Sequence, residues 1–203
     1  MSSIVIFGAG GRAGRAISEE ARTRGHQVVA VLRDPARHPG IVQAVRGDVT
    51  DPGQVAELVK GSDAAVNAVS PASGPEELAA LDLDPEFFAK AADALTGSGV
   101  PRVVAVGLVA NLDGAPAMPE PFQPFTRAHA AGLERLRTSD ADWVMLTPPM
   151  TLSVDAPRLG RYRTGGETFV DGHLSYADLA VAVVDQIERP TLHGTRATVF
   201  NVD

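Results

Sequence analysis

The chain has 203 residues, 44% of them hydrophobic and 21% charged, a balance typical of a globular protein with one sizeable core. A net charge of -7 argues against the basic face of a nucleic-acid-binding protein, and the absence of cysteine excludes disulfides, thiolate metal sites and cysteine nucleophiles. There is no signal-like start and no apolar stretch long enough for a membrane span. We therefore expect one cytoplasmic domain over residues 1–203, with no membrane partner.

The N-terminal segment predicts a strand, a glycine-rich turn and a helix. Residues 4–7 are apolar, and residues 15–24 predict a helix that ends at Gly25. The turn fits both G-x-G-x-x-A and G-x-x-G-x-x-G, through Gly8, Gly10, Gly11, Ala13 and Gly14. In a dinucleotide-binding unit the first glycine permits a tight turn, the next ones let the backbone approach the phosphates, and a small residue lets the helix pack closely. The helix N-terminus adds N–H groups and positive potential. The alternative is an ordinary glycine-rich turn, which the flanking strand and helix disfavour.

Apolar runs and helical segments alternate along the rest of the chain. Predicted strands cover residues 27–32, 41–45, 63–69, 102–106, 142–146 and 197–202. Predicted helices cover residues 52–60, 85–95, 125–137 and 176–188, with Asp51 and Ser175 as N-caps. This alternation predicts an α/β fold, a doubly wound parallel sheet of Rossmann type with helices on both faces.

Three longer segments interrupt this alternation, at residues 71–77, 111–124 and 148–169. Each follows the end of a predicted strand. Because open α/β sheets bind ligands beyond the carboxyl ends of their strands, we expect these segments to wall a substrate pocket.

The end of the second strand bears on the choice of cofactor. Arg33 comes first there and suits the 2′-phosphate of NADP(H), which we therefore prefer, while Asp34 keeps NAD(H) possible. Arg12, inside the glycine turn, is a second candidate for a phosphate contact. After the third strand, Asp48 is either an acceptor for the adenine amino group, with Val49 packing on the ring, or a turn former.

These residues resemble the atypical short-chain dehydrogenases of the NAD(P)H-binding, NmrA-like group, which includes the biliverdin reductase B-type flavin reductases. The matching stretches are IVIFGAGGRAGRAI, VVAVLRDPAR, VRGDVTDPGQVAELVKGSDAAVNAVSP, LERLRTSDADWVMLTPP and SYADLAVAVVDQIE, which follow the family's order along nearly the whole chain. The resemblance implies cofactor contacts at Gly8, Gly11, Arg12, Ala13, Gly14, Arg33, Asp48, Val49, Ala68, Val69 and Ser70. It also implies that Pro148, Pro149 and Met150 lie near the nicotinamide.

The chain departs from the wider superfamily at the catalytic positions. Classical members carry Tyr-x-x-x-Lys on the helix after the fifth strand, where this chain has Phe125 and His129 by position. No serine or threonine lies between Ser98 and Thr126. His129 is the candidate polar active-site residue, with Thr126 as a weaker one, and the alternative for His129 is a structural helix-face histidine.

The remaining candidates add no further site. The histidines at 26, 38 and 193 lie in turns, where we expect them to be solvated, and no pair has the spacing of metal ligands.

The sequence therefore predicts an NADPH-dependent reductase of a flavin, quinone or similar flat acceptor, with a small-molecule substrate. A dinucleotide-sensing regulator of the NmrA type and an isomerase or dehydratase with bound cofactor stay open as alternatives. The oligomeric state, monomer or homodimer, is also open.

Overall fold

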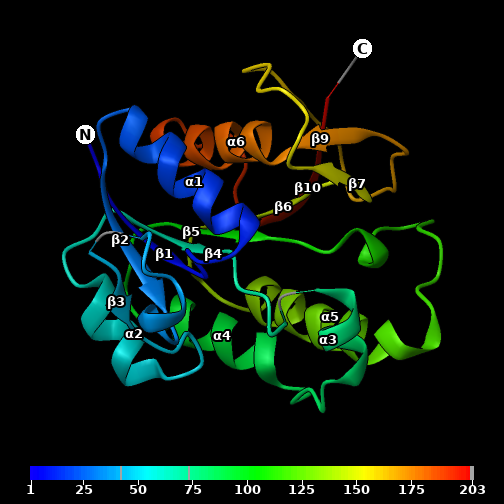
Figure 1. Ribbon diagram of the computed structural model, residues 1–203, viewed down its shortest axis with the longest axis horizontal. Coiled ribbons are helices and arrows are strands. Elements are labelled where there is room, and N and C mark those ends of the chain that lie inside the picture. Colours follow the sequence, from blue (N-terminus) through cyan, green and yellow to red (C-terminus); the bar gives the residue numbers. More distant parts are fainter. Residues whose placement is uncertain (42, 73, 202–203) are drawn as a thin grey trace.

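One large sheet, with strand order β3-β2-β1-β4-β5-β6-β10-β8, forms the centre of the computed structural model, which describes residues 1–41, 43–72 and 74–201 (Figure 1). Its strands are β1 (Ser3–Phe7), β2 (Gln27–Leu32), β3 (Val45–Arg46), β4 (Ala64–Asn67), β5 (Val103–Val106), β6 (Trp143–Thr147), β8 (Arg163–Thr164) and β10 (Thr195–Phe200). The pairings are parallel except that β8 runs antiparallel to β10. A small second sheet pairs β7 (Thr151–Ser153) with β9 (His173–Ser175). This order confirms the predicted Rossmann-type sheet.

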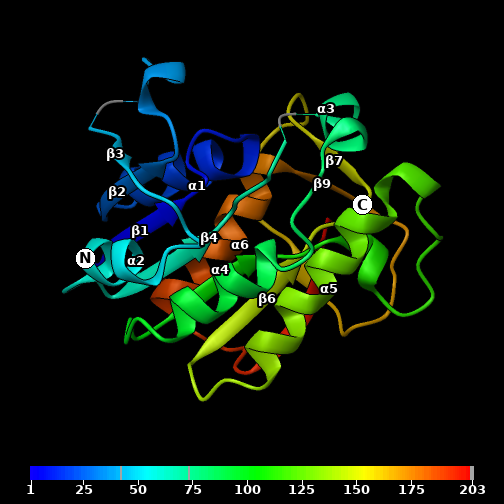
Figure 2. The ribbon, with the colours of Figure 1, turned by 90° about the horizontal axis from the view of Figure 1, so that it is seen from below.

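Helices cover both faces of the sheet. On one face lie α1 (Arg12–Thr23) and α6 (Tyr176–Glu188), which pack against each other (Figure 1). On the other lie α2 (Pro52–Val59), α4 (Phe87–Thr96) and α5 (Gln123–Arg137), and Figure 2 shows α4 and α5 side by side. The short helix α3 (Pro75–Ala80) and the 3-10 turns η1 (Pro35–Arg37), η2 (Val109–Asn111) and η3 (Glu120–Phe122) lie in the connections. Among the described residues, every helix is too short or too polar to cross a lipid bilayer.

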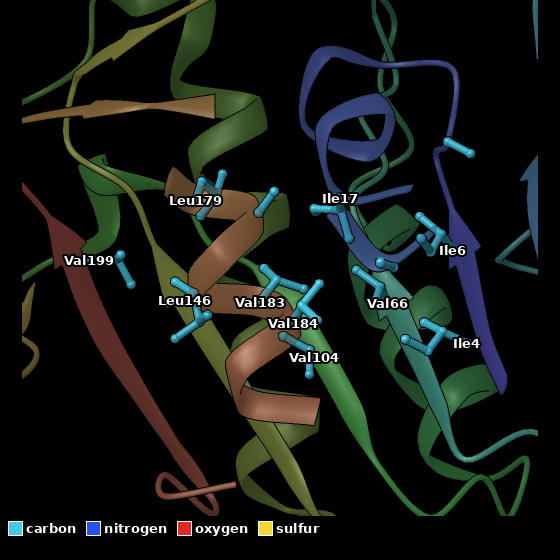
Figure 3. Close-up of a cluster of buried hydrophobic side chains, with 14 of the residues drawn as sticks. Ile4, Ile6, Ile17, Val66, Val104, Leu146, Leu179, Val183, Val184 and Val199 are labelled. Carbon is cyan, nitrogen blue, oxygen red and sulfur yellow. The ribbon is translucent and has the colours of Figure 1, made fainter. Parts of the chain in front are cut away.

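Two apolar clusters fill the layers between sheet and helices. Because successive side chains of a strand point to opposite faces, Ile4 and Ile6 join one cluster while Val5 and Phe7 join the other. Figure 3 shows the first cluster, in which side chains of β1, β4, β5, β6 and β10 meet Ile17 of α1 and residues of α6. Burying each such side chain contributes about 1.5–3 kcal/mol. Strands that are apolar on both faces therefore require the two helical layers.

Local signals in the sequence place several elements correctly. The strand at residues 27–32 and the helix at residues 176–188 have the predicted bounds. Ser175 caps that helix by accepting the Asp178 backbone N–H, and Asp51 caps α2 by accepting the Gln54 N–H.

The predicted third strand at residues 41–45 is wrong in its bounds. The paired residues are Val45 and Arg46, opposite Val31 and Leu32. Gln43 has a φ of +59°, which breaks an extended strand, so Ile41 and Ala44 pack on the α1/α6 core cluster from a turn. Position 42 of this prediction lies outside the described residues.

Other boundaries shift by a few residues. The first helix starts at Arg12 rather than Arg15, because Gly11 already serves as its N-cap. The last strand is Thr195–Phe200 rather than 197–202, and position 202 lies outside the described residues.

The three interrupting segments also carry short elements. Helix α3 starts at Pro75, within the segment 71–77. Position 73 of that segment lies outside the described residues. The turn η3 lies within the segment 111–124, and β7 and β8 lie within the segment 148–169. A proline at the first helical position of α3, followed by Glu76 and Glu77, is a start signal that could have revealed this helix.

Candidate cofactor site and neighbouring catalytic positions

The glycine turn after β1 depends on two glycines for its shape. Gly8 has a φ of +80°, and a Cβ there would lie 2.5 Å from the Ala68 carbonyl oxygen. A Cβ on Gly14 would collide with the Gly8 carbonyl, so this glycine lets α1 pack closely on the turn. Gly8 and Gly14 therefore have the turn-forming and helix-packing positions that the motif requires.

The N-terminus of α1 is open toward solvent. No side chain of the described residues caps it, and the N–H groups of Arg12, Ala13 and Gly14 have no acceptor within this part of the chain. A Cβ on Gly11 would meet only the Gly8 carbonyl oxygen among the described atoms, at 3.5 Å. Free N–H groups beside an open glycine surface fit a bound pyrophosphate, and the exposed Arg12 stands next to them.

The segment after β4 lies directly against this turn. Ala68 and Val69 are half-buried, and the Ala68 carbonyl and the Val69 Cα are the atoms that leave no space for a side chain at Gly8. Ser70 is exposed and donates its hydroxyl to the Ala72 carbonyl. The structure thus brings together two of the segments that the sequence assigns to the cofactor.

Arg33 stands at the end of β2 and points across the same edge of the sheet. Its Nη2 donates to the Pro71 carbonyl at 3.4 Å, and the residue is exposed. The neighbouring Asp34 carboxylate caps η1 by accepting the Ala36 N–H. At this strand end Arg33 is therefore available to a ligand, whereas one carboxylate oxygen of Asp34 is already hydrogen-bonded within η1.

Asp48 forms a turn after β3. Its Oδ1 accepts from both the backbone N–H and the hydroxyl of Thr50, at 2.9 and 2.7 Å. Val49 is only 4% exposed and packs into the core cluster under α2 and α4. Most of the surface that this turn offers to a ligand therefore belongs to Asp48 rather than to the Val49 side chain.

The residues after β6 lie at the same carboxyl edge, beyond β5. Pro148 and Pro149 are buried, while Met150 is 55% exposed. The chain then enters β7, so Met150 projects from the rim of this edge.

Phe125 and His129, which we expect at the positions of the classical relay, lie one helical turn apart on α5. The His129 ring packs on Phe88 with centroids 3.9 Å apart, and its edge faces Phe125 at 5.2 Å. Burial in these apolar surroundings lowers the pKa of His129 to about 4. His129 is therefore neutral at pH 7.

A small cavity of about 20 Å³ connects His129 with the end of β4. Its lining includes Asn67 and Val69 as well as Phe88 and His129. This volume holds roughly one water molecule. A neutral imidazole thus lines the same cavity as the strand end that leads into Ala68 and Ser70.

Thr126 is half-buried, and its side chain makes a hydrogen bond at the start of its own helix. Its hydroxyl donates to the Phe122 carbonyl at 3.1 Å, and its backbone carbonyl accepts from Asn111 Nδ2 at 3.1 Å. The chain between β5 and α5 carries no hydroxyl side chain. None of these positions supplies the serine and tyrosine of the classical relay.

The expectation that all turn histidines are solvated is wrong for His26. It is 8% exposed, accepts the Ser2 N–H on Nδ1, and bonds Glu188 through Nε2 at 3.0 Å. His193 is exposed, as expected, and bonds Asp142. His38 is half-buried and lies on Gly10, a contact that the sequence analysis missed.

The long segment after β6 is tied to the α1/α6 face. Asp178 is fully buried and accepts the N–H groups of Leu159 and Gly160. Arg158 binds both carboxylate oxygens of Glu20, and these hydrogen bonds hold the pKa of Glu20 below its usual range, against the opposite effect of burial. These contacts fix the part of the segment that follows Met150.

Comparisons with known proteins agree with this geometry. A family model for NAD(P)H-binding matches residues 8–190. The protein YwnB of Bacillus subtilis (strain 168) is 30% identical over 211 aligned residues, which cover 98% of each chain.

Two solved structures share the whole fold. SP1627 of Streptococcus pneumoniae TIGR4, a candidate NADH-flavin reductase, matches with a TM-score of 0.80 and 26% identity over the full length of both chains. ChuY of Escherichia coli O157:H7, an anaerobillin reductase, matches with a TM-score of 0.77 over 100% of this chain and 98% of its own, and at 21% identity this likeness concerns the fold. The protein belongs to the NAD(P)H-binding family, which fits its resemblance to the atypical, NmrA-like short-chain dehydrogenases.

Proposed function

We propose that the protein is an NADPH-dependent reductase of a flavin, a quinone or a similar flat, conjugated acceptor. The observation that carries this proposal is a glycine turn that fits a dinucleotide in a sequence without a Tyr-x-x-x-Lys motif, and we place Phe125 and His129 at the relay positions. The name of SP1627 supports a flavin as acceptor at the level of a relative.

The residues that would hold the cofactor come from the carboxyl ends of five strands, β1, β2, β3, β4 and β6. The N–H groups at the start of α1 would bind the pyrophosphate, Asp48 would accept from the adenine amino group, and the segments after β4 and β6 would flank the nicotinamide end. The proposed set is Gly8, Gly10, Gly11, Arg12, Ala13, Gly14, Arg33, Asp48, Val49, Ala68, Val69, Ser70, Pro148, Pro149 and Met150. When bound, the nicotinamide supplies the hydride.

The charge around the adenosine end supports NADPH over NADH. Four arginines of the glycine turn, α1 and the loop after β2 make no ion pair with any acidic residue in the described ranges: Arg12, Arg15, Arg33 and Arg37. In a chain with a net charge of -7, such a group of unneutralised guanidinium groups favours an additional phosphate.

The proposed acceptor class follows from the side chains around the relay positions. A ketone becomes an alkoxide and needs a positioned proton donor, whereas a flavin or quinone spreads the developing charge over its own conjugated system. His129 stacks on Phe88 and is neutral at pH 7, so it has no proton to spare as a general acid. We therefore assign it a role in positioning the nicotinamide ribose, and we assign Thr126 to the same region. The segments 111–124 and 148–169 would wall the acceptor pocket, and the protein would draw on the cytoplasmic pool of NADPH.

A second candidate is a dinucleotide-sensing regulator. The same absence of a Tyr-Lys relay supports it, because a protein that only binds the cofactor needs no proton donor. Turnover separates the two functions.

The test is NADPH oxidation, followed at 340 nm, with a panel of flavins, quinones and aliphatic ketones. We expect turnover with at least one flavin or quinone. Tight NADPH binding without oxidation by any acceptor would favour the sensor instead.

A further inference from the structure

The loop between β2 and β3 rests on the glycine turn through His38. A Cβ placed on Gly10 would lie 2.7 Å from His38 Nε2 and 2.9 Å from its Cδ2 and Cε1. The imidazole therefore fills the space that Gly10 leaves by having no side chain. Gly10 is needed here for the approach of a histidine from the protein itself, in addition to any approach of a ligand.

Arg15 fixes both the ring and its protonation pattern. Its Nε donates to the Gly10 carbonyl at 2.8 Å, and its Nη2 lies 3.2 Å from His38 Nδ1. Because a guanidinium has only donors, Nδ1 must accept, and a neutral ring then carries its proton on Nε2. Nε2 is also the ring atom nearest to the Cβ position of Gly10. The contacts thus place an N–H donor beside the glycine turn, with the face of the ring on Gly10.

The location of this donor points to the adenosine ribose. The loop that carries His38 begins directly after Arg33, and the end of β2 is where a Rossmann-type sheet meets the 2′ position of that ribose. Arg15 approaches the ring from α1, and Arg33 and Arg37 belong to the same loop region. No acidic residue in the described part of the chain forms an ion pair with His38. A donor among unneutralised cations suits a phosphate group.

We infer that His38 is a specificity-determining residue whose Nε2–H donates to the 2′-phosphate of NADPH, next to Arg33. This inference rests on the proposed cofactor binding and adds a residue to it. Arg15 acts as a positioning residue, because it holds the ring in the tautomer that presents the donor.

Fluorescence titrations with NADPH and with NADH test this role in wild type and three variants. His38→Ala should weaken NADPH binding roughly tenfold, the worth of one hydrogen bond to a charged group, and leave NADH within about twofold. His38→Gln retains an N–H donor and should recover part of the loss. His193→Ala removes an exposed histidine that bonds Asp142, just before β6, and should change neither affinity.

Two smaller probes separate the 2′-phosphate from the pyrophosphate. Adenosine 2′-monophosphate should lose affinity in His38→Ala, whereas adenosine 5′-monophosphate should not.

The inference would be overturned if His38→Ala left the ratio of NADPH to NADH affinity unchanged, or if it weakened both cofactors equally. Tighter binding of both cofactors by His38→Ala would also overturn it, because the ring would then obstruct the site. Wild-type protein that binds neither cofactor would instead refute the proposed function.

Discussion

His129 stacks on Phe88 with ring centroids 3.9 Å apart and an angle of 32° between the ring planes. The close approach of α4 and α5 makes this possible, because a Cβ on Gly132 would lie 2.8 Å from the Phe88 Cβ. The stacked imidazole is 7% exposed, and burial lowers its pKa to about 4. The pair therefore places a neutral, polar ring between α4 and α5.

This buried histidine predicts a loss of stability in acid. In the unfolded chain its pKa is about 6.5, so between pH 6.5 and 4 the unfolded state binds a proton that the folded state does not. The contribution of the neutral ring to the free energy of unfolding is fully present above pH 6.5. It falls by about 3 kcal/mol in total as the pH drops toward 4. Urea unfolding of wild type and His129→Leu at pH 7.5 and 5.0 checks this. The variant should lose less stability on acidification, and an equal loss in both would show that His129 does not titrate in this way.

Substitutions at two glycines of the turn, Gly11 and Gly14, are expected to have different effects. Gly11→Val should abolish binding of either cofactor while circular dichroism stays native, because a side chain there meets ordinary contacts in the protein but covers the α1 N-terminus. Gly14→Val should instead disrupt the fold, since its Cβ collides with the Gly8 carbonyl. Undiminished NADPH affinity in Gly11→Val would mean that the phosphates bind elsewhere.

Arg33 is expected to select the cofactor. Removing a charge-assisted contact to phosphate costs roughly 1.5–3 kcal/mol, so Arg33→Ala should weaken NADPH binding by one to two orders of magnitude and leave NADH nearly unchanged. Lys60→Ala, on the C-cap of α2, removes one positive charge elsewhere and serves as the control for net charge. Equal wild-type affinities for NADPH and NADH would refute the role of Arg33.

The hydroxyl of Thr198 is buried and has no hydrogen-bond partner among the described residues. An unsatisfied buried hydroxyl costs about 1–3 kcal/mol, so the nearly isosteric Thr198→Val should raise the free energy of unfolding by about 1 kcal/mol. Chemical denaturation measures this directly. A clear loss of stability would mean that the hydroxyl bonds an ordered water.

Local chemistry explains which parts of this fold the sequence reveals. Helix α6 was predicted to the residue because the Ser175 cap and an apolar run act within the segment itself. The glycine motif is likewise local, so the turn could be predicted, although α1 starts at Arg12 rather than at Arg15. The third strand could not, because Gln43 has a positive φ, a conformation that is uncommon for residues other than glycine and that its apolar neighbours do not signal.

The contacts that the sequence missed join distant segments. His38 meets Gly10 only because the loop after β2 folds back over the turn after β1. His26 is buried because α6 brings Glu188 to it from 162 residues away along the chain. His129 could be placed on its helix by spacing alone, but its low pKa depends on Phe88 of a different helix.

The most direct test of the proposed reductase is a comparison of acceptors under one set of conditions. With NADPH in excess, we expect rapid oxidation with a flavin or quinone and rates near background with an aliphatic ketone. His129→Leu should keep flavin or quinone turnover within about tenfold of wild type, because removal of a true general acid would cost 10²–10⁴-fold. Fast ketone reduction by the wild type that survives His129→Leu would contradict the account, since another proton donor would then lie in the pocket.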